Sequence, residues 1–480
     1  MALSDIDTFV YVMLENRSFD HMLGYLSLDD TPGRMAVDGL RTDPAWRARH
    51  ANLGNGTPHQ VKRLLSAQPI DEDPPHGNAT IAKQINTPTA GGAATMGGFV
   101  QTYLDAFRNP PPADPAAVMG YYDAEAVGIY DFLARNYCVC DRWFTPLPLG
   151  TQANRLMAMS GTSKVVDNVR GLPDQELVYD WLGGRGIGWR AYVSGGFVPF
   201  FLMMSKWTVR IGASLAFGDG PFRRLGKLAA NWASSKTMPQ VIFIEPEYGD
   251  APGSKPNDDH PPAPVSRGQK LVAEVYNTLI ANPARWSRTM MIITYDEHGG
   301  FFDHVPPLAI PGKAGATAFA TTGPRVPALI VSPHVGQGQV FSEALDHTSF
   351  LQLLADRFTS DGKYSPPVTE RNQALGRISR ALLATPRTGP PPPLPQLQFQ
   401  AMTPLAAAAP EAIAPAAADA PPTPNAFALD AAARRFAAEC PEAIERPELR
   451  QLKHYLERNA PPMPRRRDNV GRVPADLKRR

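Results

Sequence analysis

The sequence predicts an α/β fold with a mostly parallel central sheet that helices flank on both faces. Short, continuously apolar runs are typical of strands buried on both sides. Such runs occur at residues 8–14, 189–193, 240–244, 289–294 and 326–331. Apolar residues at helical spacing lie between them, at 129–136, 175–182, 268–280 and 346–358. Strands that alternate with helices favour a parallel sheet.

The 480 residues are expected to form one large domain with an appendage. Residues 1–385 form the main domain, and loop-rich insertions at about 30–125 lie over the strand ends. Residues 386–425 are Pro/Ala-rich and predict a linker. Residues 426–480 regain helical character and end in a basic tail, interpreted as a solvated terminus or as a peripheral contact with an anionic membrane.

The net charge, the cysteine count and the first residues of the sequence limit the kinds of protein to be considered. A net charge of +2 gives no reason to expect a nucleic-acid partner, and the sequence does not address the oligomeric state. Cys138, Cys140 and Cys440 make an odd count, which predicts reduced cysteines rather than a disulfide framework. No signal peptide precedes the first predicted strand, so a cytoplasmic protein is expected, with export by a route that needs no such signal as the alternative.

The strand at 289–294 is followed by two adjacent acids, Asp296 and Glu297, and then by a glycine pair. Ligands of open α/β sheets bind beyond the carboxyl ends of the strands. Two neighbouring buried acids are costly unless a cation or a donor neutralises them. The stretch therefore predicts a divalent metal site.

The first strand also ends in oxygen ligands, Glu15 and Asn16. Taken alone, the pair is equally compatible with a turn in which Glu15 forms a salt bridge to Arg17. If the first strand lies beside the strand at 289–294, both sets of oxygens meet at one edge of the sheet.

Thr151 is expected to cap a short helix that stops at Gly161. A hydroxyl at a helix N-terminus meets free backbone N–H groups and the positive end of the helix dipole, which bind phosphate and stabilise an alkoxide. Asn154 and Arg155 add donors for phosphoryl oxygens. The alternative is an ordinary helix cap.

Histidines recur beside acids or prolines in the segments that follow the strands. His260 stands between two acids and a proline pair, His347 follows Asp346 at a helix start, and His76 follows two prolines. Each is alone compatible with a surface loop or a cap. Together with the acids they predict a metal-assisted site for phosphoryl or sulfuryl transfer.

At this point the chain resembles the phosphoesterase family of bacterial phospholipases C and related acid phosphatases, within the alkaline phosphatase superfamily. Six stretches carry the resemblance and occur in the family's order over about residues 5–360. They are 15–20, 151–155, 257–262, 295–307, 323–327 and 346–349.

The resemblance implies an alkaline-phosphatase-like fold and specific roles. One divalent cation (Ca, Mg, Mn or Zn) would be bound by Glu15, Asn16, Asp296, Glu297 and Thr151. Thr151 would also be the nucleophile that forms a covalent phospho-threonine. The phosphoryl group or the leaving group would be held by His76, Asn154, His260, His304 and His347. The family usually has proline where this chain has Ala153. The loss of proline loosens the turn, but the donors Asn154 and Arg155 are kept.

Three functions stay open. The resemblance favours a phospholipase C that cleaves phospholipid headgroups, and the apolar run at 197–204 would then line a lipid entrance, or else belong to the core. The alternatives are an acid phosphatase for small phosphorylated metabolites and a catalytically idle binding module. A sulfatase needs a Cys-x-Pro-x-Arg type sequence that the chain lacks, and no Gly-x-Ser-x-Gly or phosphate-loop motif occurs.

Overall fold

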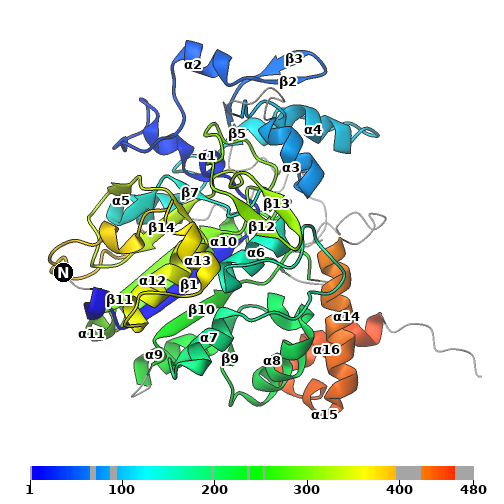
Figure 1. The fold of residues 1–480 in the computed structure, drawn as a ribbon, viewed down its shortest axis with the longest axis vertical. Coiled ribbons are helices and arrows are strands. Elements are labelled where there is room, and N and C mark those ends of the chain that lie inside the picture. The colour runs from blue at the N-terminus through cyan, green and yellow to red at the C-terminus, as the bar shows by residue number, and fades with distance from the viewer. Residues whose placement is uncertain are drawn as a thin grey trace, which may run out of the picture.

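The computed structural model describes residues 3–64, 72–86, 94–196, 199–234, 238–251, 255–395 and 423–459. Its centre is an eight-stranded sheet in the order β15-β6-β14-β11-β1-β10-β8-β9 (Figure 1). The strands, in chain order, are β1 (Thr8–Leu14), β6 (Cys138–Cys140), β8 (Trp189–Val193), β9 (Phe222–Arg224), β10 (Val241–Glu245), β11 (Thr289–Tyr295), β14 (Ala328–Val331) and β15 (Gln339–Phe341).

The predicted fold class is confirmed. β1 runs parallel to both β10 and β11, and β8 is parallel to β10 and β9. Each of the five apolar runs is a strand, and β1 and β8 have the predicted bounds. β14 departs from the parallel arrangement, because it pairs antiparallel with β11 and β6.

Helices pack in layers against the sheet (Figure 1). α12 (Thr348–Phe358) contacts β1 directly, since Phe350 stacks on Tyr11 with ring centroids 4.2 Å apart. It also packs against α6 and α13, whereas α10 packs against α5, α9 and α11. These helices are α5 (Gly128–Asn136), α6 (Thr151–Ser160), α9 (Leu228–Ser234), α10 (Ser266–Ile280), α11 (Pro283–Trp286) and α13 (Pro366–Arg371).

The predicted insertion region carries small elements, blue to cyan in Figure 1, that lie to one side of the sheet. They are α2 (Pro44–Arg49), β2 (Asn52–Gly54), β3 (Thr57–His59), β4 (Lys62–Arg63), α3 (Asn78–Ile85), α4 (Phe99–Ala106) and β5 (Gly120–Tyr121). The loop before α3 brings His76 to the strand ends.

The C-terminal helices form a group beside α8 (Ser205–Phe217), as Figure 1 shows. They are α14 (Pro424–Glu439), α15 (Pro441–Ile444) and α16 (Arg450–Arg458). Most of the predicted linker and the basic tail lie outside the described residues. Within the described residues, no helix combines the length and the apolar content needed to cross a membrane.

Candidate active site

The register of the sheet places the acids of β1 and β11 side by side. Leu14 pairs with Tyr295, so Glu15 and Asp296 leave their strands at the same level. Backbone hydrogen bonds continue beyond the strands, because Arg17 N donates to the Glu297 carbonyl at 3.1 Å. The pairing of β1 with β11 thus brings both sets of predicted oxygen ligands to one edge of the sheet.

Asn16 links this edge to a histidine. Its backbone is left-handed, with φ of 63°, and its N–H donates to Asp296 Oδ1 at 3.2 Å. In the amide orientation that satisfies both of its polar atoms, Asn16 donates to Glu297 Oε1 at 2.8 Å and accepts from His260 Nε2 at 2.6 Å. The carboxamide therefore bridges an acid of β11 and the loop after β10.

Arg155, one turn into α6, is the built-in counter-ion of the acids. Its guanidinium lies 3.0 Å from Glu15 Oε1 and 3.2 Å from Asp296 Oδ2. It also donates to the Tyr248 hydroxyl at 3.1 Å and stands 5.0 Å from the centroid of the Phe200 ring. The sequence predicted Arg155 as a phosphoryl donor, and the structure instead pairs it with two of the predicted metal ligands.

One arginine does not neutralise this group of buried acids. Burial raises the pKa of Glu15 well above its usual range, and it raises that of Asp296 to about 6 against the opposing charge of Arg155. Burial also acts on Glu297, but the charges of His76 and His298 lower its pKa. Glu15 Oε2 is buried with no hydrogen-bond partner among the described residues. An orphaned carboxylate oxygen beside excess negative charge favours a bound divalent cation. Glu15, Asp296 and Glu297 are not, however, among the described groups that bring three candidate ligand atoms within 4.8 Å of one another.

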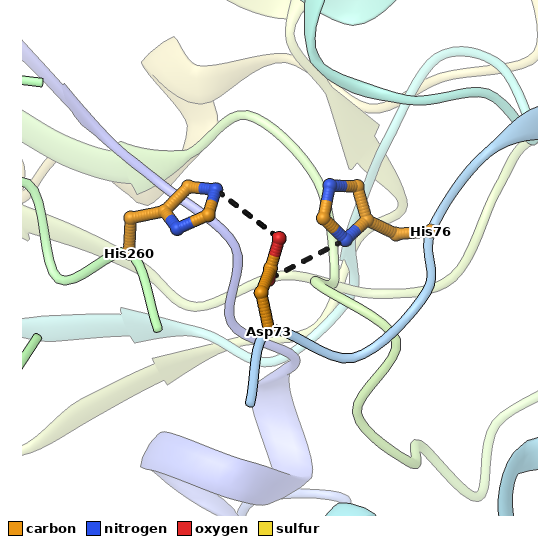
Figure 2. Close-up of side chains that lie close together, drawn as sticks. All are labelled: Asp73, His76 and His260. Carbon is orange, nitrogen blue, oxygen red and sulfur yellow. Dashed lines mark ion pairs between the residues drawn. The ribbon is translucent and has the colours of Figure 1, made fainter. Parts of the chain in front are cut away.

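His76 and His260 face each other across Asp73, as Figure 2 shows. His76 Nδ1 lies 3.7 Å and His260 Nε2 lies 3.8 Å from the Asp73 carboxylate. Among the described residues, this is one of two groups whose three candidate ligand atoms lie within 4.8 Å of one another. His76 connects this pair of histidines to the acids, because its Nε2 lies 3.8 Å from Glu297 Oε1.

Neighbouring acids favour the protonated form of both histidines. Burial disfavours the imidazolium of His76, but the charges of Glu297 and Asp73 outweigh it and raise the pKa to about 9. The pKa of His260 is likewise raised, with Asp73 and Asp250 acting against burial. His260 also donates from Nδ1 to the Pro261 carbonyl at 2.6 Å, and the Asn16 orientation given above fits a ring that is protonated on Nε2 as well.

Thr151 is the first residue of α6, the helix whose Arg155 pairs with Glu15 and Asp296. The helix runs from Thr151 to Ser160 and ends at Gly161 with φ of 79°, as predicted. Its N-cap is Gly150, however, so Thr151 is the first helical residue rather than the cap. A Cβ at Gly150 would lie 3.2 Å from the His76 carbonyl oxygen, which leaves the start of α6 in contact with the histidine loop.

Asn154 is engaged with the backbone that leads into α6. Its oxygen accepts from Leu147 N at 3.1 Å, and its NH₂ group donates to the carbonyls of Leu149 at 2.5 Å and Gly150 at 3.3 Å. Both polar atoms of the amide thus shape the turn before Thr151.

His304 belongs to a second buried ion cluster. Its Nδ1 lies 2.7 Å from Asp20 Oδ2 and its Nε2 lies 3.3 Å from Asp38 Oδ1. Arg325 joins the same cluster at 3.1 Å from Asp20 and 2.9 Å from Asp303. Asp20, Asp303 and His304 are the other group with three candidate ligand atoms within 4.8 Å. Arginine already pairs with both of its acids.

His347 lies behind Asp296. Trp143 Nε1 donates to His347 Nδ1 at 3.0 Å, so the opposite nitrogen carries the proton and donates to the Asp296 carbonyl at 2.8 Å. Burial lowers the pKa of His347 to about 4, which keeps the ring neutral. The side chain therefore anchors the end of β11 through its backbone.

Sequence reasoning missed Asp73. The residue stands three positions before His76, in an acidic stretch, and nothing in that spacing indicates that it also approaches His260. The contact arises because the loop before α3 folds over the loop after β10. The apolar run predicted at a lipid entrance is buried at Phe200 to Met204, and residues 197–198 lie outside the described residues.

Comparison with known proteins agrees with the six motif stretches. The model of the Phosphoesterase family matches residues 6–360. Non-specific phospholipase C6 of Arabidopsis thaliana is 32% identical over 420 residues, which cover 82% of this chain and 76% of that protein. Phospholipase C A of Mycobacterium tuberculosis is 28% identical over 433 residues, covering 80% and 78%. A solved structure of a protein in the alkaline phosphatase superfamily from Vibrio parahaemolyticus is 12% identical, with a TM-score of 0.32 over 54% of this chain and 64% of that chain.

Proposed function

The chain belongs to the Phosphoesterase family, and from this premise we propose that it is a metal-dependent phospholipase C that cleaves the phosphodiester of phospholipid headgroups. The observation that carries the proposal is the meeting of three elements. The acids at the ends of β1 and β11 pair with Arg155 of α6, His76 lies beside Glu297, and His260 faces His76 across Asp73. Acids for a cation, a hydroxyl and imidazolium donors are the parts that phosphoryl transfer requires.

Glu15, Asn16, Asp296 and Glu297 would hold one divalent cation together with Thr151. Oxygen ligands favour a hard cation such as Ca, Mg or Mn, and the nearby histidines keep Zn as a candidate. When bound, the cation supplies charge neutralisation at the phosphoryl group and lowers the pKa of a hydroxyl beside it. The orphaned Glu15 Oε2 supports this assignment.

Thr151 is the proposed nucleophile. Its oxygen attacks phosphorus in line, the bond to the departing alkoxide breaks, and a covalent phospho-threonine forms. His260 supports the leaving group, because its protonated Nε2 can give a proton to the alkoxide. His76 supports the phosphoryl oxygens as a second cation. Water then releases the phosphorylated headgroup.

Three of the predicted contact residues take supporting roles in this proposal. Asn154 shapes the turn before the nucleophile, His347 holds the end of β11, and His304 belongs to the cluster around Arg325. The polar atoms of each are already bonded within the protein, so we assign them to positioning rather than to contact with substrate.

A substrate comparison tests the proposed function. The purified protein is assayed with phosphatidylcholine in mixed micelles and with a matched phosphomonoester, each with a divalent cation present. Release of phosphocholine with little release of phosphate from the monoester supports the phospholipase C. Hydrolysis of the monoester alone would identify the acid phosphatase instead, and bound metal without hydrolysis of either ester would identify the idle binding module.

A further inference from the structure

The start of α14 reaches the helix that carries Thr151. Asn425, in the first turn of α14, is 3% exposed although it lies 65 residues beyond the last residue, 360, matched by the family model. Its side-chain oxygen accepts a hydrogen bond from Gln152 Nε2 at 2.8 Å. Gln152 directly follows Thr151 in α6 and is itself fully buried. A residue near the C-terminus thus contacts the neighbour of the proposed nucleophile.

Gln152 fixes the first turn of α6. Its NH₂ group also donates to the Val169 carbonyl at 2.8 Å, and its oxygen accepts from Val169 N at 2.9 Å. The bond to Asn425 completes the hydrogen bonding of this buried amide. Without Asn425, Gln152 would lose one of its two donations in a site that water does not reach, which costs more than the bond itself contributes.

The side-chain nitrogen of Asn425 donates a hydrogen bond to a second loop, the one that follows β10. This Nδ2 donates to Asp250 Oδ2 at 2.9 Å, and Thr423 donates to Asp250 Oδ1 at 2.7 Å. Asp250 belongs to the segment that follows β10 and stands next to Gly249, whose N–H donates at 2.6 Å to Oδ2 of Asp258, two residues before His260. Asn425 therefore ties the Thr151 helix to the loop that leads toward His260.

From these contacts we propose that Asn425 is a positioning residue for Thr151, and that α14 is part of the catalytic unit rather than an appendage. The inference rests on the proposed role of Thr151 as nucleophile. Displacement of a reacting group by about 1 Å can cost about 100-fold in rate. A lost bond at Gln152 is therefore expected to lower turnover more than substrate binding.

The docking of α14 does not depend on Asn425 alone. Phe436 packs so closely on α8 that a Cβ at Gly212 would lie 2.0 Å from its ring. Arg435 donates to Ser205 Oγ at 2.8 Å and to Thr208 Oγ1 at 2.7 Å. Arg435→Ala is therefore a matched control, since it weakens the docking of the same helix without touching Gln152.

The test measures kcat, KM and melting temperature for wild type, Asn425→Ala and Arg435→Ala, with phosphatidylcholine in mixed micelles and a divalent cation. We expect Asn425→Ala to lower kcat about tenfold and to leave KM within about twofold. Arg435→Ala should lower the melting temperature and keep kcat. The inference is overturned if Asn425→Ala keeps the wild-type kcat, or if both variants lose kcat alike.

A double-mutant cycle with Gln152→Leu identifies the route of the effect. If Asn425 acts through Gln152, the double variant loses no more kcat than Gln152→Leu alone, whereas independent losses that multiply would contradict this route. Should Asn425→Ala not fold, Gln152→Leu breaks the same bond from the side of α6, and wild-type kcat in that variant overturns the inference. Wild type that hydrolyses no phosphodiester would instead overturn the proposed function.

Discussion

At the residue scale, the proposed chemistry depends on buried acids and basic side chains whose charges do not fully cancel. Arg155 pairs with Glu15 and Asp296, yet an oxygen of Glu15 stays without a partner among the described residues. His76 and His260 add positive charge on the opposite side of Asn16. The excess negative charge of the acids favours binding of a cation, and positive charge on the histidines favours binding of an anionic phosphoryl group.

Replacement of Thr151 tests the nucleophile. Thr151→Ala removes the hydroxyl and is expected to lower kcat for phosphatidylcholine by at least about 1,000-fold, because the proposed mechanism has no other group that could form the covalent intermediate. Thr151→Ser keeps a hydroxyl at the start of α6 and should retain part of the turnover. Circular dichroism and the melting temperature of both variants serve as folding controls. Unchanged turnover in a folded Thr151→Ala variant would remove Thr151 from the mechanism.

His304 gives the protein a pH-dependent stability. Burial disfavours its imidazolium, but Asp20 and Asp38 outweigh burial and raise the pKa from 6.5 to about 9. Since the folded pKa lies above the unfolded one, the stabilisation is complete below about pH 6.5 and is lost as the pH rises through about 9. Its upper bound is about 3 kcal/mol.

Urea unfolding of wild type and His304→Gln between pH 6 and pH 10 measures this contribution. The difference in free energy of unfolding between the two proteins should shrink as the pH rises from about 6.5 to about 9 and then stay constant. Groups that His304 does not influence cancel in the difference, whereas His50 does not, because the charge of His304 helps to lower its pKa. A difference that stays constant over this range would show that His304 is not protonated in the folded state.

At the scale of elements, the turns after β1 and β11 hold the ligands in register. Gly299 has φ of 62°, and a Cβ there would lie 2.2 Å from the Asn16 carbonyl oxygen. Its N–H donates to Glu297 Oε2 at 2.8 Å. Two features therefore require glycine at this position. Its backbone is left-handed, and the turn after β1 comes too close for a Cβ.

Gly299→Ala should consequently weaken metal binding as well as stability. Gly186→Ala is the matched control, because Gly186 has φ of 67° but nothing within 4 Å of a built Cβ. Both variants carry the left-handed strain of about 1 kcal/mol, and only Gly299→Ala displaces Asn16. Calorimetric titration with Mg²⁺, Ca²⁺, Mn²⁺ and Zn²⁺ should show weaker binding in Gly299→Ala alone. Equal affinities in the two variants would contradict the role of this turn.

Some strands of the sheet could be predicted from the sequence, and others could not. Long apolar runs such as 8–14 and 289–295 are strands because burial on both faces demands continuous apolarity. β6, β9 and β15 are three residues each, too short for a periodic signal, and went unpredicted. The antiparallel direction of β14 also depends on chain connections that local pattern does not encode.

At the scale of the whole molecule, the candidate site gathers residues from distant parts of the chain. Glu15 and Asp296 could be placed together from sequence because parallel strands end at one edge. Asp73 and Asn425 could not, since each reaches the site through the packing of a separate segment. The family resemblance implies contact with the phosphoryl or leaving group for His304 and His347, and the fold gives both of them partners within the protein.

The central claim is that the acids after β1 and β11 hold a cation that hydrolysis requires. Its most direct test is phosphatidylcholine turnover before chelation, after verified removal of bound metal, and after re-addition of each candidate cation, in wild type and in Glu297→Gln. We predict that turnover disappears on chelation and returns with at least one cation in wild type, and that Glu297→Gln needs a higher concentration of that cation. Full turnover by wild-type protein with no bound metal would contradict the claim.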